Sequence, residues 1–354
     1  MYSAHGVHPV VSDILLSICI STYNRAAFLG ETLGNILSQI PDGAEVVVLD
    51  GGSSDGTESV VRKYLGRYPQ LRYFRQKKNL GVDRDFNEVV QLATGRYCWL
   101  FTDDDLLKPG AIRTVLQRLR TNPGLLIVNS EIRNSDFSEI LQERALSMIE
   151  DRTYGRGDWR TFFLDVAVYA SFIGCIVIRK AIWEGRERER YFGTEFIHVG
   201  VIFQRPIADE IVVLAEPLIL IRYGNAQWTP RGFEVWMLKW PKLIWSFSDF
   251  ADSDKRRITP ADPWRSIKEL ITLRAKGCYS LEEYKKWLSS RLPFGFAKLV
   301  TLLVALLPGP LVNAFCLAYF SRVYKDARTW HVDLTNSRFH QKNFLSSLIK
   351  SFTG

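Results

Sequence analysis

The stretch Tyr97-Cys98-Trp99-Leu100-Phe101-Thr102-Asp103-Asp104-Asp105 decides the fold and places the candidate site. Its first five residues are bulky and apolar, a pattern typical of a buried strand. Three carboxylates follow at once, and such a group is unfavourable without a cation because like charges repel and buried charges lose hydration. Oxygen ligands suit a hard divalent ion such as Mg²⁺, which leaves positions for water and substrate phosphates. For an isolated triple Asp, the alternative is an acidic turn that binds nothing.

Other short apolar runs flank this strand along the chain, at residues 14–20, 45–50, 71–75 and 125–128. Apolar residues at helical spacing separate them, and Pro109 suits the first turn of one of these helices. The run at 71–75 is predicted to lie near a sheet edge. Strands that alternate with helices predict a doubly wound α/β sheet, with its ligand at the carboxyl ends of the strands.

Polar turns follow two of these strands. Ser21-Thr22-Tyr23-Asn24-Arg25 leads into a helix whose N-terminus presents backbone N–H groups to an anion. Asp50 ends the next strand at the edge where ligands bind, and we favour a ligand-binding role over a purely local turn contact. For Asp55, in the turn that follows, we favour an ordinary helix N-cap.

Composition indicates a globular protein of one large domain or two, with 354 residues of which 47% are hydrophobic. The cysteines are scattered singly, without a Cys-x-x-Cys pair, which favours buried thiols in a reducing compartment over zinc or disulfides. They are Cys19, Cys98, Cys175, Cys278 and Cys316. Met1 to Asp13 lacks the basic and then apolar pattern of a signal peptide, so we expect a cytoplasmic location for the main body.

The positive net charge is a property of the C-terminal part. From Lys255 to Gly354 there are 17 Lys and Arg against 6 Asp and Glu. The same part contains an uncharged stretch from Leu299 to Ser321. Basic residues beside an apolar stretch favour an anionic membrane surface over nucleic acid as the partner.

Five segments that occur in order carry a resemblance to a family. They are residues 18–25, 48–57, 79–81 with Asn87, 95–97 and 103–105. This succession resembles family 2 glycosyltransferases of the GT-A fold. Within the family, Tyr97-Cys98-Trp99 before the acids and Asp83-Arg84-Asp85-Phe86 earlier are most similar to bacterial O-antigen transferases of the abequosyltransferase type.

The resemblance implies an inverting transfer of a sugar from a nucleotide diphosphate donor to an acceptor hydroxyl. It assigns Asp104, with Asp105, to a Mn²⁺ or Mg²⁺ ion that neutralises charge on the leaving diphosphate. The nucleotide-sugar ligands that it implies are Thr22, Tyr23, Arg25, Asp50, Arg84, Asp85 and Asp103. Thr22, Tyr23 and Arg25 would line the nucleotide pocket, Asp50 would bind the base or ribose, and Arg84 or Asp85 would approach the diphosphate or sugar.

Thr102 departs from the family pattern. The family usually has Asp-x-Asp followed by Asp, and alignment through Pro109 puts Thr102 where the first acid is expected. Asp103 is a candidate replacement, because Asp103-x-Asp105 gives the same motif in another register.

An inverting transfer also needs a general base for the acceptor hydroxyl. The family places an acid at the start of a helix in the acceptor half, and the best positional match here is residues 193–200. Glu195 and His198 lie nearly one turn apart in this segment, and both remain candidates for the base. His198 is also a candidate metal ligand, although a single histidine is more often structural.

The C-terminal part holds two apolar pieces, 299–307 and 311–320, on either side of Pro308-Gly309-Pro310. The break argues against one straight membrane crossing, which needs about 20 helical residues. We expect a hairpin that dips into one leaflet, with a buried helix pair as the alternative. The basic flanks are Lys285, Lys286, Arg291 and Lys298 on one side and Arg322, Lys325 and Arg328 on the other. The segment from Trp228 to Phe250 is so rich in aromatic residues that it is either a partner or membrane face or part of the core.

These observations predict three segments: a donor-binding half at 1–130, an acceptor-binding half at 131–254 and a helical membrane-association region at 255–354. The expected partners are a nucleotide-diphosphate sugar, a lipid-linked oligosaccharide acceptor and the cytoplasmic face of the bacterial inner membrane, and not nucleic acid. One alternative is a nucleotidyltransferase, although no glycine-rich, lysine-containing phosphate loop follows the first strand. The other is a catalytically inactive glycan-binding or scaffold protein, which Thr102 alone suggests.

Overall fold

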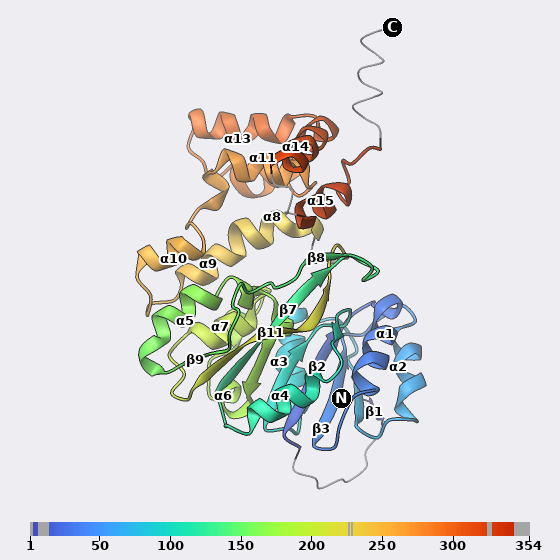
Figure 1. The fold of residues 1–354 in the computed structure, drawn as a ribbon. Coiled ribbons are helices and arrows are strands. Elements are labelled where there is room, and N and C mark those ends of the chain that lie inside the picture. The colour runs from blue at the N-terminus through green and yellow to red at the C-terminus, as the bar shows by residue number, and fades with distance from the viewer. Residues whose placement is uncertain (1–2, 6–13, 226, 228, 324–327, 343–354) are drawn as a thin grey trace. The chain divides into compact units, whose positions relative to one another are not determined.

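The computed structural model of the chain describes residues 3–5, 14–225, 227, 229–323 and 328–342 (Figure 1). Trp228 of the aromatic segment, Lys325 of the basic flank and residues 6–13 of the N-terminal stretch lie outside the described residues.

The chain divides into two compact units. Unit 1 comprises Met1–Arg133, Glu143–Arg222 and Phe247–Asp254, and unit 2 comprises Asn134–Gln142, Tyr223–Ser246 and Lys255–Gly354. The three segments predicted from the sequence are thus distributed over two units. Strands from both sides of residue 130 belong to unit 1 because they pair within one sheet.

Unit 1 alternates strands and helices. Its elements are β1 (Ser3–His5), β2 (Leu16–Thr22), α1 (Ala26–Leu37), β3 (Ala44–Asp50), α2 (Thr57–Leu65), β4 (Leu71–Arg75), α3 (Val82–Leu92), β5 (Tyr97–Phe101), β6 (Leu106–Leu107), α4 (Ala111–Leu119), β7 (Leu125–Arg133), β9 (Arg152–Tyr154), α5 (Trp159–Val166), β10 (Ile176–Arg179), α6 (Lys180–Glu184), α7 (Ile197–Phe203) and β11 (Ile211–Arg222).

The sheet follows the order β1-β4-β3-β2-β5-β10-β7-β11-β6. Strands β4, β3, β2 and β5 run parallel, whereas β10 is antiparallel to both β5 and β7. This confirms the predicted α/β sheet and shows that it is mixed. The prediction that residues 71–75 lie near an edge also holds, because among the described strands only β1 lies beyond β4.

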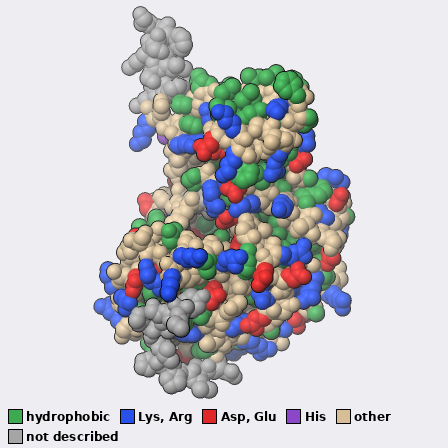
Figure 2. Space-filling model, turned by 180° about the vertical axis from the view of Figure 1, so that it is seen from behind, with side chains coloured by type: hydrophobic (Ala, Val, Ile, Leu, Met, Phe, Trp, Pro, Cys, Tyr) green, Lys and Arg blue, Asp and Glu red, His purple; other side chains and the backbone are tan. Residues whose placement is uncertain are grey.

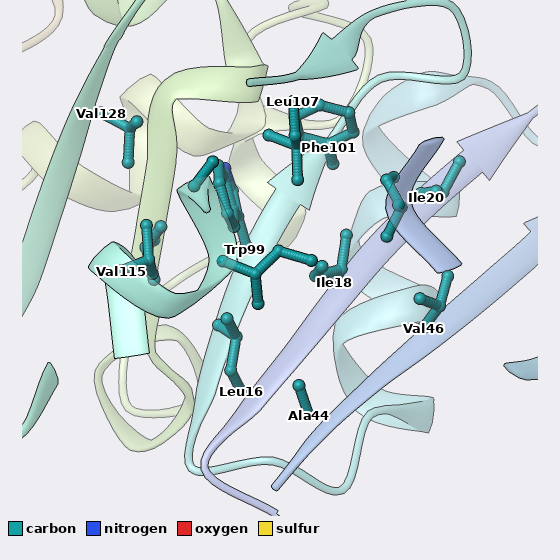
Figure 3. Close-up of a cluster of buried hydrophobic side chains, with 14 of the residues drawn as sticks. Leu16, Ile18, Ile20, Ala44, Val46, Trp99, Phe101, Leu107, Val115 and Val128 are labelled. Carbon is teal, nitrogen blue, oxygen red and sulfur yellow. The ribbon is translucent and has the colours of Figure 1, made fainter. Parts of the chain in front are cut away.

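The core of unit 1 explains why its central strands are almost continuously apolar. Side chains of β2, β3 and β5 on one face pack with α1, α2 and α4, and Figure 3 shows this cluster around Trp99 and Phe101. Alternate residues such as Cys19, Val47 and Leu100 are also buried, on the face where α3 packs against β2 and β3. A sheet covered on both faces needs apolar side chains at every position.

Pro217 lies within β11, where the pairing of this strand with β7 is irregular. The register shifts between Leu214 and Ile219, so the strand continues past a bulge. A bulge tolerates proline because the ladder hydrogen bond that proline cannot donate is already interrupted. The second half of β11 then reaches the carboxyl edge of the sheet at Arg222.

Unit 2 is mostly helical. It holds β8 (Ile140–Gln142), α8 (Gly232–Glu234), α9 (Trp240–Trp245), α11 (Ile267–Ala275), α12 (Leu281–Glu283), α13 (Phe296–Leu306), α14 (Gly309–Val323) and α15 (Arg328–Thr335). Helix α10 (Asp252–Ile258) spans the boundary in sequence between the two units. The core of unit 2 contains Phe233, Trp264, Tyr279 and Leu288, packed with Val304 and Ala305 of α13. A smaller cluster contains Ala275, Cys316 and Leu334.

The aromatic segment packs inward. Trp240 is buried and Trp236 packs on the core of unit 2, while the indole of Trp245 donates to the carbonyl of Thr259 at 3.0 Å. Within unit 1, Phe250 stacks on Phe163. For the described part of this segment, the structure supports core packing and not a membrane face.

The two apolar C-terminal pieces form helices α13 and α14, and the chain bends by 92° between them. Among the described residues, no single helix is long and apolar enough to cross a membrane, although this bent pair has the combined length and composition for it. Each helix buries part of its surface in the core of unit 2.

Candidate active site

Polar side chains meet where the parallel strands of unit 1 end. Thr22 of β2 is paired with Asp50 of β3, and Asp50 is paired with Arg75 of β4. Strand β5 ends at the same edge, because Phe101 is paired with Ile20. The register therefore brings the turns after β2, β3 and β5 together, as the sequence predicted.

Hydrogen bonds join the turn after β2 to the turn after β3. The backbone N–H of Asn24 donates to Ser53 Oγ at 2.8 Å, and that of Arg25 donates to Thr57 Oγ1 at 3.0 Å. Asp55 accepts from the backbone N–H groups of Ala26 and Thr57, the first residues of α1 and α2. The N-cap position of α2 is Gly56 and not Asp55 as predicted, but Asp55 still binds N–H groups where both helices begin.

Gly51 lies close to residues of three segments at this edge of the sheet. A Cβ atom at Gly51 would lie 3.0 Å from Asp85 Oδ2, 3.6 Å from the carbonyl oxygen of Thr22 and 3.7 Å from Tyr23 Cβ. Thr22 and Tyr23, where β2 ends, therefore lie near Asp85 of α3. Burial and the nearby Asp50 charge raise the pKa of Asp85 to about 6.

Asp50 is fully buried and makes two hydrogen bonds inside the protein. Its Oδ1 accepts from the backbone N–H of Ser53 at 2.7 Å, and its Oδ2 accepts from the hydroxyl of Tyr73 at 2.7 Å. These bonds fix the carboxylate at the floor of the pocket. Asp50 Oδ2 also lies 3.6 Å from Arg75 Nε in an ion pair.

Arg25 lies between the first two acids of the triplet. Its Nε donates to Asp103 Oδ1 at 3.1 Å, and its Nη2 donates to Asp104 Oδ2. Burial, with the Asp104 charge, raises the pKa of Asp103 to about 6, and Arg25 opposes this shift. The turn after β2 and the end of β5 thus form one charged centre.

Asp105 points away from this centre into the protein. Its oxygens accept from the hydroxyl of Thr102 and from the backbone N–H of Arg222, the latter at 2.7 Å. Burial and the Asp104 charge raise the pKa of Asp105 well above its usual value. This geometry favours a structural role for Asp105, in place of the metal-ligand role that the resemblance implied, and it gives Thr102 the role of a hydrogen-bond donor.

Arg222 was not identified from the sequence. It is the last residue of β11, is buried, and donates from Nε to the carbonyl oxygen of Asp104 at 2.9 Å. Its Nη2 also donates to Glu31 of α1. A charged residue that ends a long apolar strand was the available signal, but only the sheet order places the end of β11 beside the acids.

Helix α3 connects the donor pocket with the segment predicted to carry the base. Asp83 accepts from the backbone N–H groups of Glu195 and Ile197 at 2.9 and 3.0 Å. The guanidinium of Arg84 lies over the ring of Phe192, 4.4 Å from its centroid, so Arg84 is placed toward this segment. One turn of α3 therefore supplies Asp83 and Arg84 to the segment before α7 and Asp85 to the donor pocket.

Glu195 and His198 lie in different surroundings. Glu195 is half-buried and has a φ of 71°, a left-handed conformation that is uncommon for residues other than glycine. His198 is buried, with Nε2 2.8 Å from the carbonyl oxygen of Ala170, and burial lowers its pKa to about 4. The geometry therefore favours Glu195 over His198 as a group that meets substrate.

Comparison with other proteins agrees with this geometry. Residues 17–185 match the family described as Glycosyl transferase family 2. Residues 17–185 therefore form a family 2 glycosyltransferase domain. It is 27% identical to the abequosyltransferase RfbV of Salmonella typhimurium over 298 residues, which are 78% of this chain and 88% of the relative. It is 32% identical over 183 residues to the GalNAc(5)-diNAcBac-PP-undecaprenol beta-1,3-glucosyltransferase of Campylobacter jejuni, covering 51% of this chain and 57% of that one.

Two solved structures share the fold of this family 2 glycosyltransferase. Residues 1–349 of Staphylococcus aureus TarS superpose with a TM-score of 0.55 at 17% identity, covering 91% of this chain and 89% of the other. The mannosyltransferase PcManGT of Pyrobaculum calidifontis, in complex with GDP-Man and Mn²⁺, superposes with a TM-score of 0.51 at 17% identity, covering 97% and 88%. At this identity the likeness shows the fold alone.

The acids of this family 2 glycosyltransferase fit a divalent cation. Asp103 and Asp104 offer hard carboxylate oxygens beside each other, and burial and the Asp104 charge raise the pKa of Asp103 although Arg25 lies between the two acids. Within the described ranges, no three His, Cys, Asp or Glu side chains come together as a metal cage. One or two carboxylates are what Mg²⁺ or Mn²⁺ needs when phosphates and water supply the other ligands.

Proposed function

We propose that this glycosyltransferase transfers a sugar, with inversion, from a nucleotide-diphosphate sugar to a hydroxyl group of a glycan acceptor in bacterial surface polysaccharide synthesis. The observation that carries the proposal is the meeting of the nucleotide-pocket candidates Thr22, Tyr23 and Asp85 with the Asp103–Asp104 pair at one edge of the sheet. The named activities of RfbV and of the Campylobacter relative support the class of reaction. TarS has been crystallised with UDP and with UDP-GlcNAc, which supports a nucleotide sugar as donor.

We assign the donor pocket to Thr22, Tyr23, Asp50 and Asp85. Asp50 and Asp85 are buried carboxylates that can accept from ribose hydroxyls or a base N–H. Arg25 would bind the diphosphate, because a guanidinium at a helix N-terminus suits phosphate oxygens. Arg84, exposed on α3, faces the segment before α7 and is assigned to the sugar or diphosphate.

Asp104 and Asp103 would hold Mn²⁺ or Mg²⁺. The ion would supply positive charge that stabilises the leaving diphosphate. The complex of PcManGT with GDP-Man and Mn²⁺ supports this assignment. Asp105 would support the pair indirectly, since Thr102 and Arg222 hold its side chain inside the protein.

Glu195 is the proposed general base. Its carboxylate would accept the proton of the acceptor hydroxyl while that oxygen attacks the anomeric carbon and the bond from this carbon to the diphosphate breaks. The two backbone bonds to Asp83 fix the segment that carries Glu195. His198 would then be a structural residue that packs behind this segment.

The proposed acceptor is a lipid-linked oligosaccharide, and the proposed location is the cytoplasmic face of the inner membrane. An undecaprenol-linked acceptor is part of the printed name of the Campylobacter relative. The basic excess and the apolar pair α13 and α14 support attachment to a membrane surface.

The test is a titration of UDP, GDP, CDP and dTDP with and without Mn²⁺. A donor-hydrolysis screen follows, with nucleotide sugars that contain the nucleotide that binds. We expect one nucleotide to bind at least about tenfold more tightly with Mn²⁺, because the ion joins the Asp pair to the diphosphate. Asp104→Asn is the matched control and should lose the effect of Mn²⁺. Metal-independent binding, or binding without hydrolysis or transfer of any sugar, would contradict the proposal.

A further inference from the structure

Large apolar side chains are exposed mainly in one short part of unit 2. Among the described residues, those outside 294–323 are Leu80, Val82, Ile149, Val168 and Ile267. Within 294–323 they are Phe294, Phe296, Leu299, Leu303, Leu306, Leu307, Leu311, Phe315, Tyr319 and Val323. We call this second set the apolar face. Figure 2 shows hydrophobic side chains gathered at the top of the view, where Figure 1 places α13 and α14.

The apolar face is not the core-packing side of these helices. Phe296, Leu299, Leu303 and Leu306 recur at intervals of three or four residues, so they share one side of α13. The buried residues of α13 are Thr301, Val304 and Ala305. In α14, the exposed residues Leu311, Phe315 and Tyr319 likewise share a side, while Asn313, Ala314 and Cys316 are buried. Each helix thus has apolar residues on the side that packs on unit 2 and also on the side that is exposed.

The charges that lie closest to the apolar face in the sequence are basic, whereas the neighbouring helices α12 and α15 carry the acids Glu282, Glu283 and Asp333. From Tyr284 to Val323 the chain carries Lys285, Lys286, Arg291, Lys298 and Arg322 and not one acidic residue. A symmetric dimer through this face would bring these cations toward their copies, which is unfavourable. An anionic surface attracts them. Charge complementarity therefore selects a membrane with acidic headgroups over a second copy of the chain.

We propose that the apolar face docks on an anionic phospholipid bilayer, with α13 and α14 lying in the plane of the membrane surface. The proposal deepens the membrane location in the proposed function and rests on it. Helix α13 has 11 residues, or about 17 Å at 1.5 Å per residue, and so is far too short for a hydrocarbon core of about 30 Å. Two helices at 92° define a plane, and apolar sides with basic edges are the pattern of interfacial helices.

The test is flotation of the full-length protein with vesicles of phosphatidylcholine alone or mixed with phosphatidylglycerol. The variant Phe296→Gln/Leu303→Gln changes two residues that are 80% and 53% exposed, so the fold should be retained. The matched control Ile149→Gln/Val168→Gln makes the same kind of change in unit 1, at 83% and 57% exposure. Thermal melting confirms that both variants are folded.

We expect wild type and control to float with anionic vesicles, and Phe296→Gln/Leu303→Gln to bind at least about tenfold more weakly, since each buried large apolar side chain is worth roughly a factor of ten. Lys285→Glu/Arg291→Glu should weaken binding to anionic vesicles several-fold and leave binding to neutral ones unchanged. Equal binding by the apolar variant and its control would overturn the proposal. The proposal would also be wrong if the wild type is a dimer and this variant is a monomer that floats as the wild type does. The apolar face would then be an interface between copies of the chain.

Flotation uses no sugar donor, so its outcome is independent of the reaction. If donor hydrolysis fails while flotation succeeds, the proposed function is wrong and the docking surface stands. If donor hydrolysis succeeds while flotation fails, the docking surface is wrong and the proposed reaction stands.

Discussion

The three consecutive acids have separate tasks, although they are chemically identical. Asp103 and Asp104 share Arg25, whereas Asp105 is held inside by Thr102 and Arg222. Asp104 and Asp105 are consecutive, yet Asp104 binds Arg25 whereas the side chain of Asp105 is held inside the protein. The metal-ligand pair that we propose is accordingly Asp103 and Asp104, and not Asp104 and Asp105.

Asp104→Asn should abolish transfer and leave the fold intact. The change removes charge that would hold the ion, so we expect turnover to fall at least about a hundredfold at saturating Mn²⁺. The melting temperature should change little, because relief of repulsion with Asp103 offsets the lost contact with Arg25. Initial rates and thermal melts measure the two effects. Near wild-type turnover would mean that another acid holds the ion.

Glu195→Gln and His198→Gln should separate the two candidates for the base. We expect Glu195→Gln to lower kcat by about a hundredfold or more with little change in stability. His198→Gln should mainly lower stability, because the ring is buried against the carbonyl of Ala170. The checks are kcat for transfer and chemical denaturation of each variant. A large loss of kcat in stable His198→Gln, with active Glu195→Gln, would reverse the assignment.

Asp83 should make the stability of unit 1 depend on pH. Burial raises the pKa of Asp83 to about 6, with the Glu195 charge as a smaller cause. Because the unfolded value is near 3.9, the folded protein binds more protons between about pH 4 and 6, and stability falls as pH rises through this window, by up to about 3 kcal/mol from this group.

Asp83→Asn removes this titration and one of the two backbone hydrogen bonds. Relative to wild type, the variant should therefore be more destabilised at pH 4.5 than at pH 7.5. Urea denaturation at the two pH values measures the difference. An equal difference in unfolding free energy at both would show that Asp83 does not titrate as the structure indicates.

At the scale of elements, the end of β11 supports the loop after β5. Arg222 donates to the carbonyl of Asp104 and to Glu31, so one buried guanidinium joins β11, the acid loop and α1. Arg222→Ala should lower the free energy of unfolding by about 2–4 kcal/mol, because it removes a buried guanidinium and leaves the carbonyl oxygen of Asp104 without this donor. It should also weaken nucleotide binding with Mn²⁺, since Asp104 loses its backbone support.

Arg118→Ala is the matched control for Arg222. Arg118 pairs with Asp151 at the surface, where such a pair is worth about 0–1 kcal/mol. Denaturation and nucleotide titration of both variants give the comparison. If Arg222→Ala behaves like the control, the strand end does not hold the acid loop.

At the scale of the molecule, every donor-site candidate lies in unit 1, whereas the apolar face lies in unit 2. From the sequence, removal of residues from about Phe294 onward is expected to release the protein from membranes and to preserve nucleotide binding. The structure adds a cost to unit 2, because Val304, Ala305, Cys316 and Leu334 belong to its core clusters.

Deletion of residues 294–354 should therefore unfold unit 2 and preserve nucleotide binding by unit 1. Limited proteolysis should show a protected unit 1, and a nucleotide titration should give an affinity within a few-fold of that of the full chain. A truncated protein whose unit 2 stays protected would place α13 and α14 outside the core. Point changes on the apolar face remain the cleaner test of membrane docking.

The sequence alone determined the central sheet and the edge at which polar residues meet. Short, uninterrupted apolar runs are typical of strands covered on both faces, and Asp50 and the acids after Phe101 mark where two of these strands end. These features are local, because they depend on the order of residues within one segment. For the same reason Asp55 could be expected to bind N–H groups where α2 begins.

Only the tertiary structure decided what depends on contacts between distant segments. Asp105 turns inward because the backbone of Arg222, far away in sequence, provides a donor there. Asp83 fixes the segment of Glu195 across a similar distance, and His198 loses its candidacy because burial favours the neutral ring. In the C-terminal part, the composition predicted an apolar segment, but only packing showed which side of each helix the core covers. Periodicity in the sequence indicates which side of a helix is apolar, whereas the burial of that side depends on whether another segment packs on it.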